Sequence, residues 1–252
     1  MAAPVFPPDP KRVEKIFQRF ATLNPKPMPE LEFRDPYTLL VSVVLSAQAT
    51  DVSVNKATQK LFPVADTPQK MVKLGEARLI PFISSIGLFR NKAKNVIALS
   101  QIILDQHDGQ VPLQREAIQA LPGVGRKTAS VVLNELGVEP AIAVDTHVFR
   151  VSHRLQLVDA TTPDKVEQQL MRIIPQRYLT RAHHWLILHG RYICTAQRPK
   201  CATCPIADLC PSRGLFDPPP KKAVAKKVKA KPRPNVRPAK KKIAKKKAVK
   251  KT

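Results

Sequence analysis

The segment Leu121–Ala129 holds the residues best placed for chemistry, two glycines around one valine followed directly by Arg126 and Lys127. The chain has only eight glycines, so Gly123 and Gly125 together predict a tight turn that needs unusual backbone angles. A glycine turn that opens a helix presents free backbone N–H groups and the positive end of the helix dipole, which suits a phosphate. The segment is therefore suited to hold a phosphodiester and to place an amine beside it.

Lys127 is a candidate nucleophile in the first turn of the helix that follows. A lysine at the start of a surface helix is commonly just a solvated charge, and the helix dipole opposes its ammonium form. The same dipole, with the neighbouring Arg126, favours loss of a proton and makes a neutral, nucleophilic amine easier to reach. From the residues alone both interpretations stay open, and the solvated charge is the more common one.

A second polar cluster follows in the segment Val144–His147. Asp145 is predicted to be the N-cap of a helix that carries Val148, Phe149 and Val151 on its apolar side. An aspartate that caps a helix keeps its charge, because backbone N–H groups and the helix dipole stabilise the carboxylate. Capping and a catalytic role for Asp145 are therefore compatible.

All four cysteines of the chain gather in one short stretch with the spacing C-x6-C-x2-C-x5-C, and they are Cys194, Cys201, Cys204 and Cys210. This clustering predicts metal ligation in a reducing compartment and not disulfides. A zinc site favours two Cys-x-x-Cys pairs and only one occurs here, while four cysteines also suit a [4Fe–4S] cluster, so the chemistry alone leaves both metals open. Because four cysteines complete a site, we expect His183, His184 and His189 to serve in packing or hydrogen bonding.

The elements that position these residues are predicted to be helices. Apolar residues recur at helical spacing before and after the glycine turn, at Leu113, Ala117, Ile118 and Leu121 and at Ala129, Val132, Leu133 and Leu136. The nearly continuous apolar run Tyr37–Ala47 predicts a central buried helix that ends just before Gln48, and Asp51 is predicted to cap the next helix. Strand alternation is essentially absent, since Ala141–Val144 is too short to build a sheet. The expected fold class is all-α.

The charge of the chain points to a polyanionic partner. Residues 221–252 hold fourteen lysines and two arginines with no acidic residue, so they carry +16 of the formal +24 and leave +8 to the rest. This tail has no aromatic residue and cannot bury enough surface to fold alone. We expect it to attract nucleic-acid phosphates without sequence preference, because each phosphate contact releases counterions. No apolar run suits a membrane span or a signal peptide, so no membrane partner is expected.

Four motifs in order carry a family resemblance, namely Leu45–Asp51, Leu121–Ala129, Val144–His147 and the cysteine run. From about Val13 to Cys210 the chain resembles the iron–sulfur type of the helix-hairpin-helix DNA glycosylase superfamily, the endonuclease III family of bacteria. The resemblance implies two helical domains that flank a DNA-binding cleft. The implied parts are a six-helix domain with the hairpin (28–139), an iron–sulfur domain (11–27 and 140–211), an N-terminal extension (1–10) and a disordered basic tail (217–252).

The resemblance also implies an activity, that of a bifunctional DNA glycosylase and abasic-site lyase of base-excision repair that removes oxidised pyrimidines from duplex DNA. It assigns Lys127 as the Schiff-base nucleophile and Asp145 as the carboxylate that helps to deprotonate it. Gln48 would fill the gap left by the extruded nucleotide, and His147 would contact a phosphate or pack. The residues expected to hold the DNA backbone are Gly123, Val124, Gly125, Arg126 and Thr128. The resemblance decides for a [4Fe–4S] cluster on the four cysteines.

Two other functions remain as alternatives. An adenine-mismatch glycosylase of the same superfamily normally has no nucleophilic lysine here and carries a further folded C-terminal domain, so Lys127 and the lysine-rich tail count against it. A non-catalytic DNA-binding protein could use the hairpin as a phosphate clamp, but Lys127, Asp145 and Gln48 together count against that. We expect a monomer that acts on damaged or abasic duplex DNA in the cytoplasm, at the nucleoid.

Overall fold

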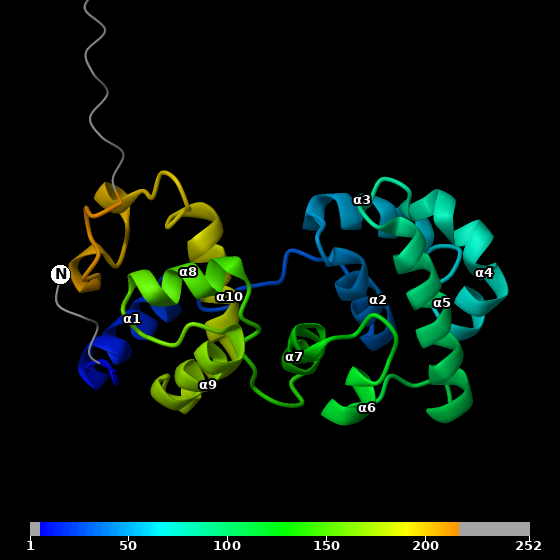
Figure 1. Ribbon diagram of the computed structural model, residues 1–252, viewed down its shortest axis with the longest axis horizontal. Helices are drawn as coiled ribbons and strands as arrows, with labels where there is room; N and C mark the ends of the chain where they lie inside the picture. The colour runs from blue at the N-terminus through cyan, green and yellow to red at the C-terminus, as the bar shows by residue number, and fades with distance from the viewer. Residues whose placement is uncertain (1–5, 217–252) are drawn as a thin grey trace, which may run out of the picture. The chain divides into compact units, whose positions relative to one another are not determined.

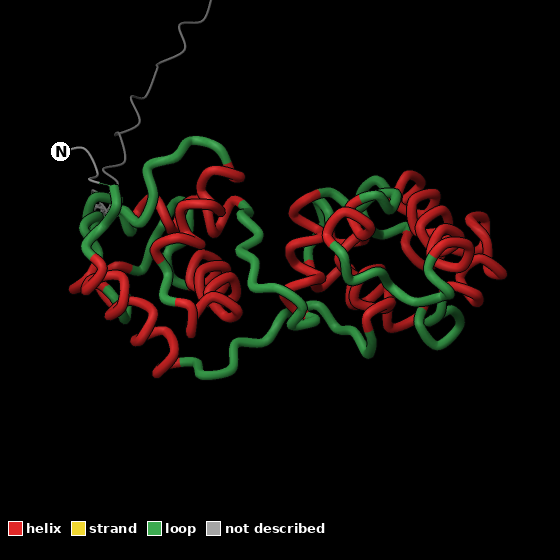
Figure 2. Tube along the Cα trace, turned by 90° about the horizontal axis from the view of Figure 1, so that it is seen from below, coloured by secondary structure: helices red, strands yellow, loops and turns green. Residues whose placement is uncertain are grey.

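The computed structural model describes residues 6–216, so the predicted basic tail lies outside the described residues. Within this range the secondary structure is helical and no strand occurs, as the colours of Figure 2 show, which confirms the all-α prediction. The α-helices are α1 (Pro10–Leu23), α2 (Pro36–Ser46), α3 (Asp51–Leu61), α4 (Pro68–Ile83), α5 (Phe89–Gln106), α6 (Arg115–Gln119), α7 (Arg126–Glu135), α8 (Thr146–Arg154), α9 (Pro163–Ile173) and α10 (Gln176–Tyr192). No helix in this range is both long and apolar enough to cross a membrane.

One hydrophobic core is built on α2, which is almost entirely buried as its apolar sequence predicts. Asp35 and Thr38 form a capping box at the start of α2, in which each side chain accepts a hydrogen bond from the backbone N–H of the other residue. Helices α3 to α7 contribute the other members of this core, and α4 and α5 run side by side (Figure 1). The core thus holds α2, and the turn that follows it, in a fixed position.

A second hydrophobic core combines α1 with α8, α9 and α10. The apolar residues Val13, Ile16, Phe17 and Phe20 of α1 are buried, and the ring of Phe17 stacks on that of Tyr178 of α10, with 6.2 Å between the ring centroids. The indole N–H of Trp185 donates to the carbonyl of Asn24 at 2.9 Å, so the C-terminal end of α1 is fastened to α10. The N-terminal helix therefore belongs to the same core as residues more than 120 positions later in the chain.

The hairpin between α6 and α7 departs from the prediction at one glycine. Gly123 has φ +79°, the left-handed conformation that glycine allows, and an added Cβ would lie 2.9 Å from the side chain of Asn95. Gly125 has φ −88° and ψ 177°, ordinary extended backbone at the N-cap of α7. The prediction of unusual angles is thus right for Gly123 and wrong for Gly125. Leu113 also lies outside the core, 46% exposed, because α6 begins only at Arg115.

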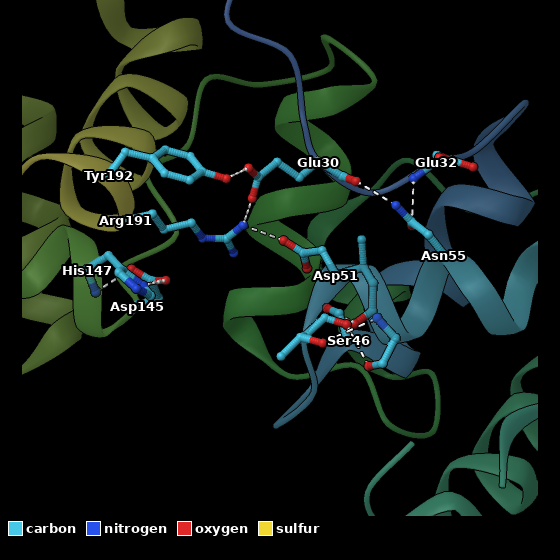
Figure 3. A network of polar contacts seen from close by, with 12 residues as sticks. Glu30, Glu32, Ser46, Asp51, Asn55, Asp145, His147, Arg191 and Tyr192 are labelled. Atoms are coloured by element: carbon cyan, nitrogen blue, oxygen red, sulfur yellow. Dashed lines mark hydrogen bonds and ion pairs between the residues drawn. The ribbon is translucent and has the colours of Figure 1, made fainter. Parts of the chain in front are cut away.

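The predicted cap of α3 is wrong by one residue. Thr50 occupies the N-cap and its hydroxyl accepts from the backbone N–H of Ser53 at 3.2 Å. Asp51 is the first helical residue, and its carboxylate pairs with Arg191 of α10 instead. Both residue types cap helices well, so the sequence signal could not separate them. Because Thr50 caps the helix, the side chain of Asp51 is available for the long-range contact with Arg191 (Figure 3).

Candidate active site and iron–sulfur loop

A cavity of about 840 Å³ is lined by residues of α2, α3, α7, α8 and α10. Five of the candidate catalytic and DNA-binding residues line it, namely Gln48, Lys127, Thr128, Asp145 and His147. The turn residues Gly123–Arg126 do not belong to its lining. The fold therefore gathers the candidate nucleophile, its candidate carboxylate partner and Gln48 around one space.

Lys127 lies in the first turn of α7, where its side chain is exposed and reaches the cavity. The helix starts there because Gly125 ends the hairpin in extended backbone, which leaves the first N–H groups of α7 without helical partners. The aliphatic face of α7 is buried against α2 and holds the opposite side of the helix. The side chain of Lys127 is thus exposed to solvent on a helix that its buried face anchors in the core.

Asp145 is the N-cap of α8, as the sequence predicts. Its Oδ1 accepts the backbone N–H groups of His147 and Val148, each at 2.8 Å, and its Oδ2 lies 2.9 Å from Nδ1 of His147. Burial raises the pKa of Asp145, but the hydrogen bonds from Val148 and His147 and the nearby charge of Lys127 outweigh it and lower the pKa overall. The carboxylate is therefore fixed, charged and largely shielded from water, with a side chain only 11% exposed.

His147 is placed by its contact with Asp145 and by the close approach of α10. Gly190 of α10 lies so near that an added Cβ would be 2.8 Å from the Cβ of His147. A larger residue at Gly190 would push α8 and α10 apart and move the Asp145 carboxylate with them. Nothing in the sequence marks Gly190, because this close approach of α8 and α10 exists only in the tertiary structure.

Arg126 points away from the cavity and joins α7 to α9. Its guanidinium lies 3.0 Å from Glu167 and 3.6 Å from Asp164. Glu167 also accepts from Ser130 on the next turn of α7 at 3.4 Å. The charge of Arg126 is therefore compensated by two carboxylates, which weakens the expectation that it destabilises the ammonium of Lys127.

Gln48 and Leu88 each adopt the left-handed backbone conformation that residues other than glycine rarely adopt, with φ +54° and +59°. A Cβ at the neighbouring Gly87 would lie 3.6 Å from the carbonyl oxygen of Gln48, so the two loops touch. Leu88 is 57% exposed despite its apolar side chain. Nothing in the sequence marks Leu88, because an exposed leucine in a strained backbone is visible only in the tertiary structure.

The four cysteines line a second, small cavity near the end of α10, together with His189 and Arg213. Arg154 donates toward Sγ of Cys194 at 3.5 Å, and Nε2 of His189 lies 3.7 Å from Sγ of Cys204. Arginines also fasten the backbone of this loop, since Arg150 donates to the carbonyl of Cys194 at 3.1 Å. Among the described residues no three His, Cys, Asp or Glu side chains converge on a site for a single metal ion.

The three histidines behave as expected from the sequence. His183, His184 and His189 are buried, and Nε2 of His184 lies 2.7 Å from Glu135. Burial lowers the pKa of His183 to about 3 and that of His189 to about 4. Both are therefore neutral at pH 7, which suits packing inside the protein.

Comparison with known proteins places this chain in a family. Residues 41–176 match the HhH-GPD superfamily of base excision DNA repair proteins, and residues 194–210 match the iron–sulfur binding domain of endonuclease III. Endonuclease III of Rickettsia conorii is 55% identical over 79% of this chain and 94% of its own, and that of Escherichia coli K12 is 52% identical over 82% and 98%. The chain belongs to the endonuclease III family.

Solved structures agree with this assignment. A trapped covalent endonuclease III–DNA intermediate matches with a TM-score of 0.76 and 43% identity, covering 81% of this chain and 97% of that one. A non-covalent endonuclease III–DNA complex matches equally well, with a TM-score of 0.76. As a member of the endonuclease III family, the chain is a DNA glycosylase with abasic-site lyase activity, it acts on duplex DNA, and it carries a [4Fe–4S] cluster.

The cysteine loop fits the cluster of the endonuclease III family. Four thiols line one cavity, and an N–H of Arg154 and the Nε2 atom of His189 approach two of the sulfurs; the charge of the arginine compensates that of cysteine ligands. Burial raises the pKa of Cys204 and Cys210, so in the protein alone these groups stay protonated and metal binding must release their protons. The cluster, when bound, cross-links the loop; the arginine contacts hold the loop against α8.

We expect the purified protein to contain iron and sulfide near four per chain, and a Cys204→Ala variant to lose most of both. Absorbance of the thiolate-to-iron charge-transfer band would measure the cluster content, and elemental analysis would measure the iron and sulfide. Ser212, a polar residue buried next to the loop, supplies a matched control, because Ser212→Ala changes the same loop without removing a thiol. Stoichiometric zinc in place of iron would contradict the cluster.

Proposed function

We propose that Lys127 is the nucleophile that removes an oxidised pyrimidine and nicks the strand. Its neutral amine attacks C1′ of the extruded nucleotide, the bond between C1′ and the base breaks, and the base leaves with the bonding electrons. The nitrogen then loses its extra proton and the C1′–O4′ bond breaks, with O4′ taking up a proton, which gives an iminium between Lys127 and C1′. The iminium makes C2′ acidic, and C2′ loses a proton as the bond to the 3′ phosphate breaks by β-elimination. The observation that supports this role most directly is the presence of Lys127 and Asp145 in one cavity lining.

Asp145 serves Lys127 through its fixed charge. The carboxylate is held by two backbone N–H groups and by His147, so it does not need to reorganise when positive charge develops on the sugar. As the family resemblance implies, it also accepts the proton that the Lys127 ammonium must lose before attack, although its charge by itself stabilises the ammonium. The contact between His147 and Asp145 makes His147 a positioning residue for the carboxylate, in addition to the phosphate contact proposed for it.

Gln48 and Leu88 fill the gap left in the duplex. Enzymes that act on a base in duplex DNA extrude the nucleotide, and apolar wedges stabilise the opened stack. The exposed Leu88 suits the wedge, and the Gln48 amide can hydrogen-bond the orphaned base on the opposite strand. Both residues hold the left-handed conformation, which costs free energy and is often found at functional sites, and this supports the role.

The hairpin is proposed to bind the DNA backbone through Gly123, Val124, Gly125, Arg126 and Thr128. Among residues 6–216 no side chain caps the N–H groups at the start of α7, and the helix dipole adds positive charge there. We further propose the domain division 28–139 against 11–27 with 140–211, which the membership of the two hydrophobic cores supports. The protein acts as a monomer on the chromosome, in the cytoplasm.

Borohydride trapping on a duplex with one oxidised pyrimidine tests the proposal. The parent protein should form a covalent adduct, because reduction captures the iminium between Lys127 and C1′. Base release without an adduct would contradict the lysine mechanism and favour a monofunctional glycosylase. Neither base release nor adduct, on intact lesions and on abasic sites alike, would leave only a DNA-binding role.

Removal of the tail at Pro220 should weaken non-specific DNA binding and its dependence on salt. If about six of its cations contact phosphates, the slope of log K against log salt should fall by about five. Fluorescence anisotropy with undamaged duplex at several salt concentrations measures the slope. A full-length variant with the tail lysines changed to glutamine is the control for chain length. A salt slope of the truncated protein equal to that of the parent would exclude a contribution of the tail to DNA binding.

A further inference from the structure

The segment 211–216, which follows the last cysteine, folds back on the iron–sulfur loop. The backbone N–H groups of Arg213 and Leu215 donate to carbonyls three residues earlier, each at 3.2 Å. Gly214, between them, has φ +78°, the left-handed conformation that glycine allows. These two turns bring Phe216 to the end of α8, where Cζ of Arg154 lies over its ring, 4.3 Å from the ring centroid.

Arg154, the last residue of α8, contacts both ends of the cysteine run. Its Nη1 lies 3.5 Å from Sγ of Cys194 and donates to the carbonyl of Thr195 at 2.7 Å. Its Nη2 donates to the carbonyl of Ala196 at 2.8 Å. At the other end of the run, Sγ of Cys210 lies 3.7 Å from the backbone carbonyl of Arg154. The guanidinium of Arg154 therefore fixes the start of the loop, while its backbone meets the last cysteine.

The aromatic ring and the loop use different parts of the guanidinium. Its N–H groups lie in one plane and donate to the loop, whereas the face of an aromatic ring attracts the positive charge as a whole. An arginine can therefore stack on a ring and keep its in-plane hydrogen bonds. Phe216 is the last described residue, yet it is only 42% exposed, which agrees with packing of its ring on the protein.

We infer that Phe216 is a positioning residue for the iron–sulfur cluster, because its ring holds the Arg154 guanidinium against the cysteine loop. The ring restricts Arg154 to the conformation that donates to the loop, and it thereby slows opening of the loop and loss of the cluster. Phe216 lies beyond the matched iron–sulfur domain, which ends at residue 210. The inference thus assigns a role to a part of the chain that the four cysteines do not include.

The substitution Phe216→Leu tests the inference, because leucine keeps an apolar side chain but has no aromatic face. The purified protein with its cluster would be mixed with an excess of an iron chelator, and the decay of the charge-transfer absorbance would be followed. F216L should lose the cluster about two- to fivefold faster than the parent, the effect of one cation–π contact at an exposed site. A rate of cluster loss equal to the parent's would overturn the inference.

Phe216→Trp is the variant that should rescue the contact, since tryptophan is the aromatic residue that attracts a cation most strongly. F216W should lose the cluster no faster than the parent. Equal acceleration in F216W and F216L would overturn the inference, because a general disturbance at this position would then explain both rates.

Two further controls separate the ring of Phe216 from the rest of the segment and from the tail. Leu215→Ala changes the neighbouring residue, which is 49% exposed, and truncation at Pro220 removes the basic tail but keeps Phe216. Both proteins should lose the cluster at the parent's rate. If either loses it as fast as F216L does, the packing of the whole segment or the charge of the tail controls cluster loss, and the inference is wrong.

Discussion

Replacing Lys127 by alanine is expected to abolish the borohydride adduct and to lower strand nicking by on the order of a thousandfold or more. The amine is the group that forms the bond to C1′, and no other lysine lines the cavity. DNA binding should persist, because the side chain is exposed and its removal leaves the apolar face of α7 intact. Gel analysis of trapped and nicked products, with anisotropy for binding, measures the two effects separately.

Lys60→Ala is the matched control for this experiment. Lys60 is an exposed helical lysine at the end of α3 and lies outside the cavity lining, so its loss removes one positive charge and no chemistry. Nicking by K127A at the rate of K60A would show that Lys127 is not the nucleophile. Loss of DNA binding in K127A, with a cluster spectrum like the parent's, would instead make Lys127 chiefly a phosphate contact.

Asp145→Asn should lower base excision by roughly a hundredfold while the protein remains folded. Asparagine is about as good an N-cap as aspartate, so the start of α8 should survive, and only the charge facing Lys127 is lost. Asp145→Ala removes both the charge and the cap and should cost about 1 kcal/mol of unfolding free energy in addition. Single-turnover excision and denaturant unfolding of the two variants separate catalysis from capping.

The lowered pKa of Asp145 sets the sign of a pH effect on stability. The folded protein holds the carboxylate charged more strongly than the unfolded chain does, so its contribution is present at neutral pH and is lost as the pH falls through the folded pKa, below 3.8. The difference in unfolding free energy between the parent and D145N should therefore become smaller under strongly acidic conditions. A constant difference from pH 7 to pH 3 and below would contradict the capping carboxylate.

Local signals predicted much of this protein because their physics acts over a few residues. The buried run at α2 and the cap at Asp145 each depend on neighbours within one or two turns, and both are confirmed. The cysteine loop is also local, and the spacing alone indicated a metal centre. Where two local signals competed, as at Thr50 and Asp51, backbone geometry decided between them.

The glycine hairpin shows where local reasoning stops. Two glycines around a valine predicted two unusual conformations, but only Gly123 adopts a positive φ, where the turn must pass close to Asn95 of α5. Gly125 stays extended because it ends the turn and caps α7. Gly123 and Asn95 are 28 positions apart in the sequence, and hydrophobic periodicity does not predict a contact over such a separation.

By itself, then, the sequence determined the helical class, the motif order and the candidate nucleophile, capping carboxylate and metal ligands, because each follows from residue type and short spacing. Tertiary structure alone decided which of them share a cavity, and it added Leu88, Gly190 and the Asp51–Arg191 pair. These last features depend on loops and helices that meet from distant parts of the chain. Burial and close approach across such distances come from the packing of two cores, and a linear pattern carries no measure of either.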